Sequence, residues 1–203
     1  MTDDRAVREP KQQRTRDTWN RVLEVGLQLF IAGGLDALTV SEVCRRTGMS
    51  PPSLYARVDG RAGLIAAVYE HAMVRIHATD TAMLAGIPGR DAPREARIAA
   101  VVTAASDQFR TQADLLRPII AASLQDEWVH RRGVEEAQRV IDNLAAGLAL
   151  EGDAGRDIAT MLFSELVIST MYGVDFASPF APDESAVRDR LIRMASARAD
   201  AGA

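Results

Sequence analysis

The sequence lacks long apolar runs and has almost no cysteine, and each of these gaps excludes a class of protein. Its single cysteine, Cys44, cannot form an intramolecular disulfide, and within an apolar stripe such a thiol is most simply a small buried hydrophobe. No apolar run approaches the roughly 18 residues that cross a membrane. The charged segment MTDDRAVREPKQQR lacks the apolar core of a signal peptide. We therefore expect a cytoplasmic chain with no membrane partner.

Residues with the spacing of metal or catalytic sites are also missing. His71 and His77 are six residues apart rather than four, so they do not share a helical face as two metal ligands would. His130 stands beside Arg131, which is a poor setting for a cation. No Ser-His-Asp order, glycine-rich phosphate loop or pair of carboxylates in an apolar setting stands out. The sequence thus predicts no metal, no cofactor and no enzymatic activity.

The composition is that of an ordinary globular protein. Hydrophobic residues make up 47% and charged residues 26% of the 203 residues, which is enough for a sizeable core in one or two domains. The net charge of −4 alone argues against a nucleic-acid partner, but residues 1 to 61 hold ten Lys or Arg and eight Asp or Glu, a net of +2. The rest hold 14 and 20, a net of −6. Because an excess of +2 also fits ordinary surface variation, charge does not decide the matter.

Residues 39 to 61, TVSEVCRRTGMSPPSLYARVDGR, have the pattern of two short capped helices joined by a glycine turn. Thr39 can cap the first helix, and we expect the Glu42 side chain to reach back to the Thr39 backbone N–H in a capping box. Gly48 can take the positive φ that ends this helix, and Ser50, followed by proline, can cap and open the second. This layout predicts a helix-turn-helix, whose second helix enters the major groove of DNA with its N-terminal residues.

Around this motif, residues 14 to 64 resemble the DNA-binding domain of the TetR/AcrR family of transcriptional regulators. Spread over about fifty residues, the matching features are far more specific than a single helix-turn-helix. They are an arginine-flanked first helix that runs into Gly34, then Thr39-Val40, Gly48-Met49-Ser50, Ser53-Leu54-Tyr55, Arg61 and Leu64.

The segment departs from the family pattern at three places. Cys44 replaces the usual alanine, Val58 the usual phenylalanine, and residues 60 to 63, GRAG, the usual cap, lysine and acidic residues. The helix after the motif should therefore lose a few tenths to about 1 kcal/mol at its start. Arg61 still supplies the basic side chain that the family uses at this place.

The resemblance implies an all-α, dimeric regulator with a flexible arm at residues 1–12, a helix-turn-helix DNA-binding domain at 13–60 and a ligand-binding and dimerisation domain at 61–203. Its partners would be a double-stranded DNA operator, a small-molecule effector and a second copy of the chain. The expected DNA-binding residues form two groups. Phosphate contacts are expected from Thr39, Arg45, Ser53, Tyr55 and Arg61, and contacts near base edges from Pro51, Pro52 and Arg57.

Helical periodicity extends over the whole chain, and no β-alternating run of useful length appears. The first helix should run from about residue 14 to 32 and stop at Gly33-Gly34, with Trp19 as a partly buried aromatic that supports the motif. Further helices are expected near residues 62 to 84, 93 to 110, 114 to 124, 125 to 150, 153 to 172 and 183 to 198.

The last two of these helices are amphipathic. The resemblance implies that they pair with their symmetry copies in a four-helix dimer interface, whereas the alternative is that their apolar faces complete the core of one chain. The residues of these faces are Ile158, Met161, Leu162, Leu166, Val187, Leu191 and Met194.

An effector pocket is expected, by analogy with the family, among the helices after residue 61. Apolar and aromatic residues are the candidates for its lining, although each is more simply a core residue. The candidates are Met73, Phe109, Leu116, Ile120, Trp128 and Phe163.

We therefore predict a TetR-like repressor that binds a palindromic operator as a dimer and is released by a small, mostly hydrophobic effector. One alternative is a helical small-molecule binding protein whose motif no longer reads DNA, which predicts no salt-dependent DNA binding. Another is an all-α enzyme with a C-terminal pocket, which predicts turnover of a bound compound.

Overall fold

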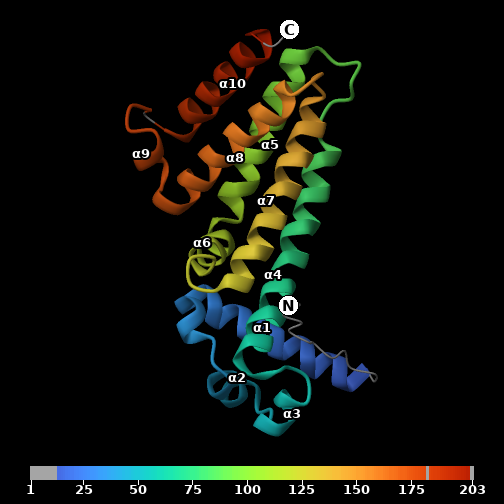
Figure 1. Ribbon diagram of the computed structural model, residues 1–203, viewed down its shortest axis with the longest axis vertical. Coiled ribbons are helices and arrows are strands. Elements are labelled where there is room, and N and C mark those ends of the chain that lie inside the picture. The colour runs from blue at the N-terminus through green and yellow to red at the C-terminus, as the bar shows by residue number, and fades with distance from the viewer. Residues whose placement is uncertain (1–12, 182, 202–203) are drawn as a thin grey trace. The chain divides into compact units, whose positions relative to one another are not determined.

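The computed structural model of the protein describes residues 13–181 and 183–201, and within them it contains helices and no strand (Figure 1). The all-α prediction is confirmed, while the expected arm at residues 1–12 lies outside the described residues. In chain order the helices are α1 (Gln13–Ala37), α2 (Val40–Thr47), α3 (Pro51–Tyr55), α4 (Gly60–Ala85), α5 (Arg94–Thr111), α6 (Ala113–Ala122), α7 (Glu127–Leu148), α8 (Ala154–Tyr172), α9 (Val174–Ala177) and α10 (Glu184–Ala201).

The helices expected from the sequence all form, with most ends within about three residues of the predicted ones. The break predicted at Gly33-Gly34 is present inside α1, where Gly34 has a φ of 62° that favours glycine. The four-residue helix α9 was not anticipated. Among the helices that the structure describes, none combines the length and the apolar character that crossing a membrane requires.

The chain divides into two compact units, which we call the N-terminal and C-terminal units. The N-terminal unit holds the described residues up to Ile76 together with Pro118–His130. The C-terminal unit holds His77–Arg117 and the described residues from Arg131 onward. This division falls within α4, α6 and α7. The functional boundary at residue 60 stays a prediction.

Packing in the N-terminal unit is tight where α1 meets α4. A Cβ placed on Gly26 would lie 2.5 Å from Val68 Cγ2, so the two helices can approach this closely only because residue 26 has no side chain. Trp19, Val22 and Phe30 of α1 are buried in the same unit. Trp19 is only 6% exposed, so it lies deeper than the partly buried position that its spacing suggested.

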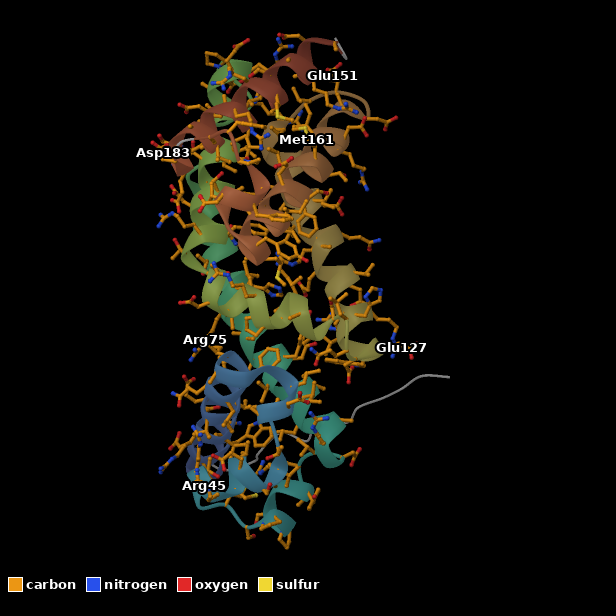
Figure 2. All side chains as sticks on the ribbon, turned by 90° about the vertical axis from the view of Figure 1, so that its left-hand side faces the viewer. Arg45, Arg75, Glu127, Glu151, Met161 and Asp183 are labelled. Carbon is orange, nitrogen blue, oxygen red and sulfur yellow. The ribbon has the colours of Figure 1, made fainter. Side chains whose placement is uncertain are left out.

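The core of the C-terminal unit forms where α5, α8 and α10 pack against one another. This packing buries most of the apolar faces that the sequence placed in a dimer interface. Met161 keeps partial exposure on α8 (Figure 2), and Met194 is 37% exposed on α10. Their five companions are buried by their own chain because α5 covers them, and a partner could therefore contact only other sides of these helices. The five are Ile158, Leu162, Leu166, Val187 and Leu191.

A charged network is buried beside this core, between α4, α5 and α7. Asp80, whose side chain is 6% exposed, lies 2.6 Å from an Arg139 guanidinium nitrogen and accepts a hydrogen bond from Gln108. Arg139 also donates to Glu136 at 2.8 Å, and His77 lies 2.8 Å from the same carboxylate. Burial alone would raise the pKa of Glu136, but the hydrogen bonds from Arg139 and His77 outweigh it and lower that pKa.

Candidate functional site

Thr39 is the N-cap of helix α2, as the sequence predicts, but only half of the expected capping box forms. Thr39 has an extended backbone, and its Oγ1 accepts a hydrogen bond from the Glu42 N–H at 3.2 Å. The prediction that the Thr39 N–H donates to the Glu42 carboxylate is wrong, because that N–H donates to the Ala37 carbonyl at 3.1 Å. The Glu42 carboxylate turns instead to two arginines one turn further along the helix.

Glu42, Arg45 and Arg46 form a charged cluster on the outer face of α2. Arg45 donates to both Glu42 oxygens at 2.8 and 2.7 Å, and Arg46 Nε donates at 2.6 Å. These hydrogen bonds, first from Arg45 and then from Arg46, lower the pKa of Glu42 to about 2. The Arg45 side chain remains 68% exposed, at the surface of the N-terminal unit (Figure 2). The cluster therefore holds a guanidinium in a defined direction and still leaves it open to a phosphate.

The turn between α2 and α3 follows the predicted pattern closely. Gly48 has a φ of 73°, and its N–H closes α2 by donating to the Cys44 carbonyl at 2.9 Å. Ser50 caps α3 through a hydrogen bond from the Ser53 N–H to its Oγ at 3.4 Å, and the two hydroxyl groups lie 2.8 Å apart. Leu54, which is fully buried, anchors the other side of α3. The predicted turn at residues 48 to 50 is confirmed.

The leading end of α3 offers side chains rather than backbone donors. Pro51 and Pro52 are exposed and have no N–H, while the N–H groups of Ser53 and Leu54 both donate to the Ser50 carbonyl. Neither the prolines nor these two residues can thus give a free backbone N–H to a phosphate. What remains at this edge is the apolar surface of the proline rings, the Ser53 hydroxyl and the Tyr55 ring, which is half exposed.

Two arginines of the predicted DNA set are engaged within the N-terminal unit. The Arg57 guanidinium lies 5.6 Å from the centre of the Trp19 ring, a cation–π geometry. Arg61 donates to the Leu35 and Leu38 carbonyls, which follow the glycine break in α1. The sequence offered no signal for these contacts, because each joins residues far apart in the chain. Their roles toward DNA stay predictions.

The two short helices thus form a helix-turn-helix whose second helix exposes its first three residues. Residues 22–68 match the family of bacterial regulatory proteins described as the tetR family. This DNA-binding segment of the chain belongs to the TetR family. A segment of this family marks a DNA-binding transcriptional regulator rather than an enzyme, as the sequence predicts.

Related proteins and solved structures resemble the chain over most of its length. The HTH-type transcriptional regulator Rv2250c of Mycobacterium tuberculosis is 29% identical over 154 residues, which cover 72% of this chain and 76% of that protein. GusR of Salmonella enterica has a TM-score of 0.66 at 16% identity, over 94% of this chain and 100% of that one. A TetR-like regulator from a Rhodococcus species has a TM-score of 0.63 at 16% identity, over 97% and 100% of the two chains. These two structures share the fold.

The structure divides the six residues that the sequence proposed for an effector pocket between the two units. Met73, Ile120 and Trp128 belong to the N-terminal unit, where Met73 is buried and the Trp128 ring meets the Tyr69 ring edge-on at 5.5 Å. The C-terminal unit holds the other three candidates, Phe109, Leu116 and Phe163. The centres of the Phe109 and Phe163 rings lie 6.2 Å apart.

A cavity of the C-terminal unit, with a volume of about 250 Å³, is lined by residues of α5, α6, α8, α9 and α10. Among the six candidates, only Phe109 lines it. Three residues that the sequence placed in the dimer interface also line this cavity: Leu166, Val187 and Leu191. The arginines of this cavity were not predicted from the sequence. A charged residue on an amphipathic helix is expected to face solvent as long as the neighbouring helices are unknown.

Proposed function

We propose that this TetR-family regulator binds an inverted-repeat operator as a homodimer and represses transcription until a small effector releases it. The observation that carries the proposal is the leading end of α3, where Pro51, Pro52, Ser53 and Tyr55 are all exposed on a helix held by its caps and by buried Leu54. A helix-turn-helix reads the major groove with this end of its second helix.

The exposed groups suggest how DNA is contacted. The hydroxyls of Thr39, Ser53 and Tyr55 and the guanidinium of Arg45 suit phosphate oxygens, which fix register but carry no sequence information. Because Pro51 and Pro52 offer no hydrogen-bond donor, their contribution near the bases is apolar, and a thymine methyl group is the matching partner in the major groove.

Arg57 and Arg61 complete the proposed DNA surface. Arg57 reaches a base edge by leaving the face of Trp19, a cation–π contact worth about 0.5–1 kcal/mol at exposed sites and about 2 when desolvated. Arg61 is half exposed, so it can face a phosphate while it also bonds the carbonyls at the end of α1. Arg61 therefore acts on DNA binding in two ways, by its charge and by positioning α1.

Dimerisation would use the sides of α8 and α10 that their own chain leaves uncovered. Ile168 is 40% exposed on α8, Tyr172 is 65% exposed, and its ring lies 4.9 Å from that of exposed Phe176. Phe180 is fully exposed, and Met194 adds exposed apolar surface on α10. Exposed apolar patches mark interaction sites, and a two-fold dimer would present two α3 helices to the halves of a palindrome.

Release by an effector is a population shift between two dimer conformations. A ligand that binds more tightly when the two α3 helices are wrongly spaced for the operator lowers operator affinity, and the size of the shift equals its differential affinity. The cavity of the C-terminal unit is the proposed effector site. The functional division into a DNA-binding domain at 13–60 and an effector domain at 61–203 follows from this proposal.

The proposal is tested by selecting tight-binding sequences from random DNA and measuring affinity at two salt concentrations. We expect an enriched inverted repeat, affinity that falls as salt rises, and at least tenfold weaker binding by Tyr55→Ala. Arg156→Ala is the matched control, since Arg156 is an exposed arginine on α8 that pairs with Asp142. Absence of enrichment by a folded dimer would favour a helical small-molecule binding protein instead.

A further inference from the structure

The cavity of the C-terminal unit combines an apolar floor with arginines at its wall. Phe109, Leu166, Val174, Val187 and Leu191 supply the apolar surface, from four different helices. A volume of about 250 Å³ lies just below the range of typical ligand pockets, so it suits a small molecule. We propose that this cavity binds a small organic acid, with its apolar body on this floor and its carboxylate on Arg117 and Arg188. The inference rests on the proposed effector role of the cavity.

Arg117 is the main anchor because its guanidinium is already positioned. Its Nε donates to the Thr170 carbonyl at 2.7 Å, which fixes the plane of the group at the cavity wall. The nearest carboxylate to its terminal nitrogens is that of Asp114, at 3.7 Å, and Asp114 is 92% exposed to water. A distant, solvated partner of this kind contributes little. The terminal N–H groups are thus available to a bidentate carboxylate.

Arg188, which lines the cavity from α10, is the second anchor. Its side chain is 32% exposed, and its guanidinium lies a long 3.9 Å from the Asp107 carboxylate. Arg110 is better compensated, because it lies 3.3 Å from Asp107 and 3.7 Å from Glu184.

The charges of the lining favour one negative charge in the ligand. The lining holds three arginines and two carboxylates, so its net charge is +1, which a monoanion neutralises. These residues are Arg110, Arg117, Arg188, Asp107 and Glu184. A phosphate monoester would bring nearly two negative charges and a strongly hydrated head group to a mostly apolar wall. A single carboxylate on an apolar body therefore fits both the charge and the floor of the cavity.

Ser106 is an independent observation that points to a polar ligand. It lines the cavity, and its Oγ is buried without a hydrogen-bond partner among the described residues. A buried hydroxyl left in this way is destabilising. A ligand oxygen in the cavity would give it an acceptor after a rotation about its side-chain torsion.

The test measures binding of butanoate, hexanoate, octanoate and phenylacetate, each beside its primary amide, by calorimetry and by the shift in melting temperature. We expect at least one carboxylate to bind with one site per chain and its amide to bind at least about tenfold more weakly. Arg117→Gln and Arg188→Gln should each weaken the carboxylate by about 10- to 100-fold and leave the amide unchanged. The control Arg156→Gln, outside the cavity lining, should change neither.

Folding is checked separately, because Arg117 also bonds the Thr170 carbonyl. Arg188→Gln removes no such backbone bond, and Arg117→Lys keeps the charge while losing the planar fork, so it should recover only part of the affinity. Ser106→Ala should weaken the carboxylate without lowering the melting temperature of the free protein. No binding by any carboxylate, equal binding of acids and amides, or an Arg188→Gln protein that binds like Arg156→Gln would each overturn the proposal.

Operator binding is measured on the same preparations. Carboxylate binding by a protein that binds no operator would refute the proposed function and leave the ligand class standing. Operator binding by a protein that binds none of the carboxylates would refute the ligand class alone.

Discussion

Replacing Arg61 by alanine should destabilise the N-terminal unit, because this side chain does more than face DNA. Its guanidinium donates to two carbonyls, of Leu35 and Leu38, at the point where α1 resumes after its glycine break. Losing a hydrogen bond from a charged donor costs about 1.5–3 kcal/mol when the site is buried. Since the Arg61 side chain is 49% exposed, water replaces part of each bond, and we expect a total loss of roughly 1–2 kcal/mol.

A loss of this size should lower the melting temperature by about 2–8 °C, at about 2–4 °C per kcal/mol for a chain of this length. Thermal and urea unfolding of Arg61→Ala measure it, with Arg21→Ala as the control for removing an exposed arginine from the same unit. Arg61→Lys keeps the charge but not the forked donors, so it should restore operator affinity more fully than stability. If Arg61→Ala unfolded at the same temperature as Arg21→Ala, the positioning role would be refuted.

Three further predictions concern positions whose surroundings are well defined. Because Arg45 and Arg46 hold the pKa of Glu42 at about 2, its contribution to stability is present above pH 4.5 and is lost as pH falls from 4.5 to 2. Urea midpoints of Glu42→Gln and wild type should therefore converge over that range, and a gap that did not change with pH would contradict the ion cluster. Gly26→Ala should lower stability by about 1–3 kcal/mol through its clash with Val68, and adding Val68→Ala should recover part of the loss. Arg139→Met should cost about 3 kcal/mol or more by leaving buried Asp80 without its cation, whereas Arg193→Met, at an exposed position of α10, should change the urea midpoint little.

Local signals explain why the helix-turn-helix could be predicted residue by residue. The caps at Thr39 and Ser50, the positive φ of Gly48 and the glycine break in α1 all depend on neighbours within four positions. The same reasoning failed for the side chain of Glu42, because two arginines one turn away compete for its carboxylate with the N–H that a capping box would use. A choice between two local partners is not visible in the pattern alone.

Long-range packing explains what the sequence did not supply. Periodicity correctly marked the apolar faces of α8 and α10, but it could not tell that α5 covers Leu166 and Leu191 within one chain. Likewise, Arg117 and Arg188 stand on helices far apart in sequence, and only the fold brings both to one cavity. The aromatic candidates were chosen by residue type, and only the fold separates Phe109, which lines the cavity, from Trp128, which belongs to the other unit.

The central claim is that two copies of α3 read one operator. It is tested most directly by measuring the mass of the protein–DNA complex and the footprint that the protein leaves on its selected DNA. The account predicts two chains per operator and two protected half-sites whose centres lie about one helical turn apart. Tyr55→Ala should lose this footprint while remaining a dimer. A single chain bound to an unsymmetrical site, or an unchanged footprint with Tyr55→Ala, would contradict the account.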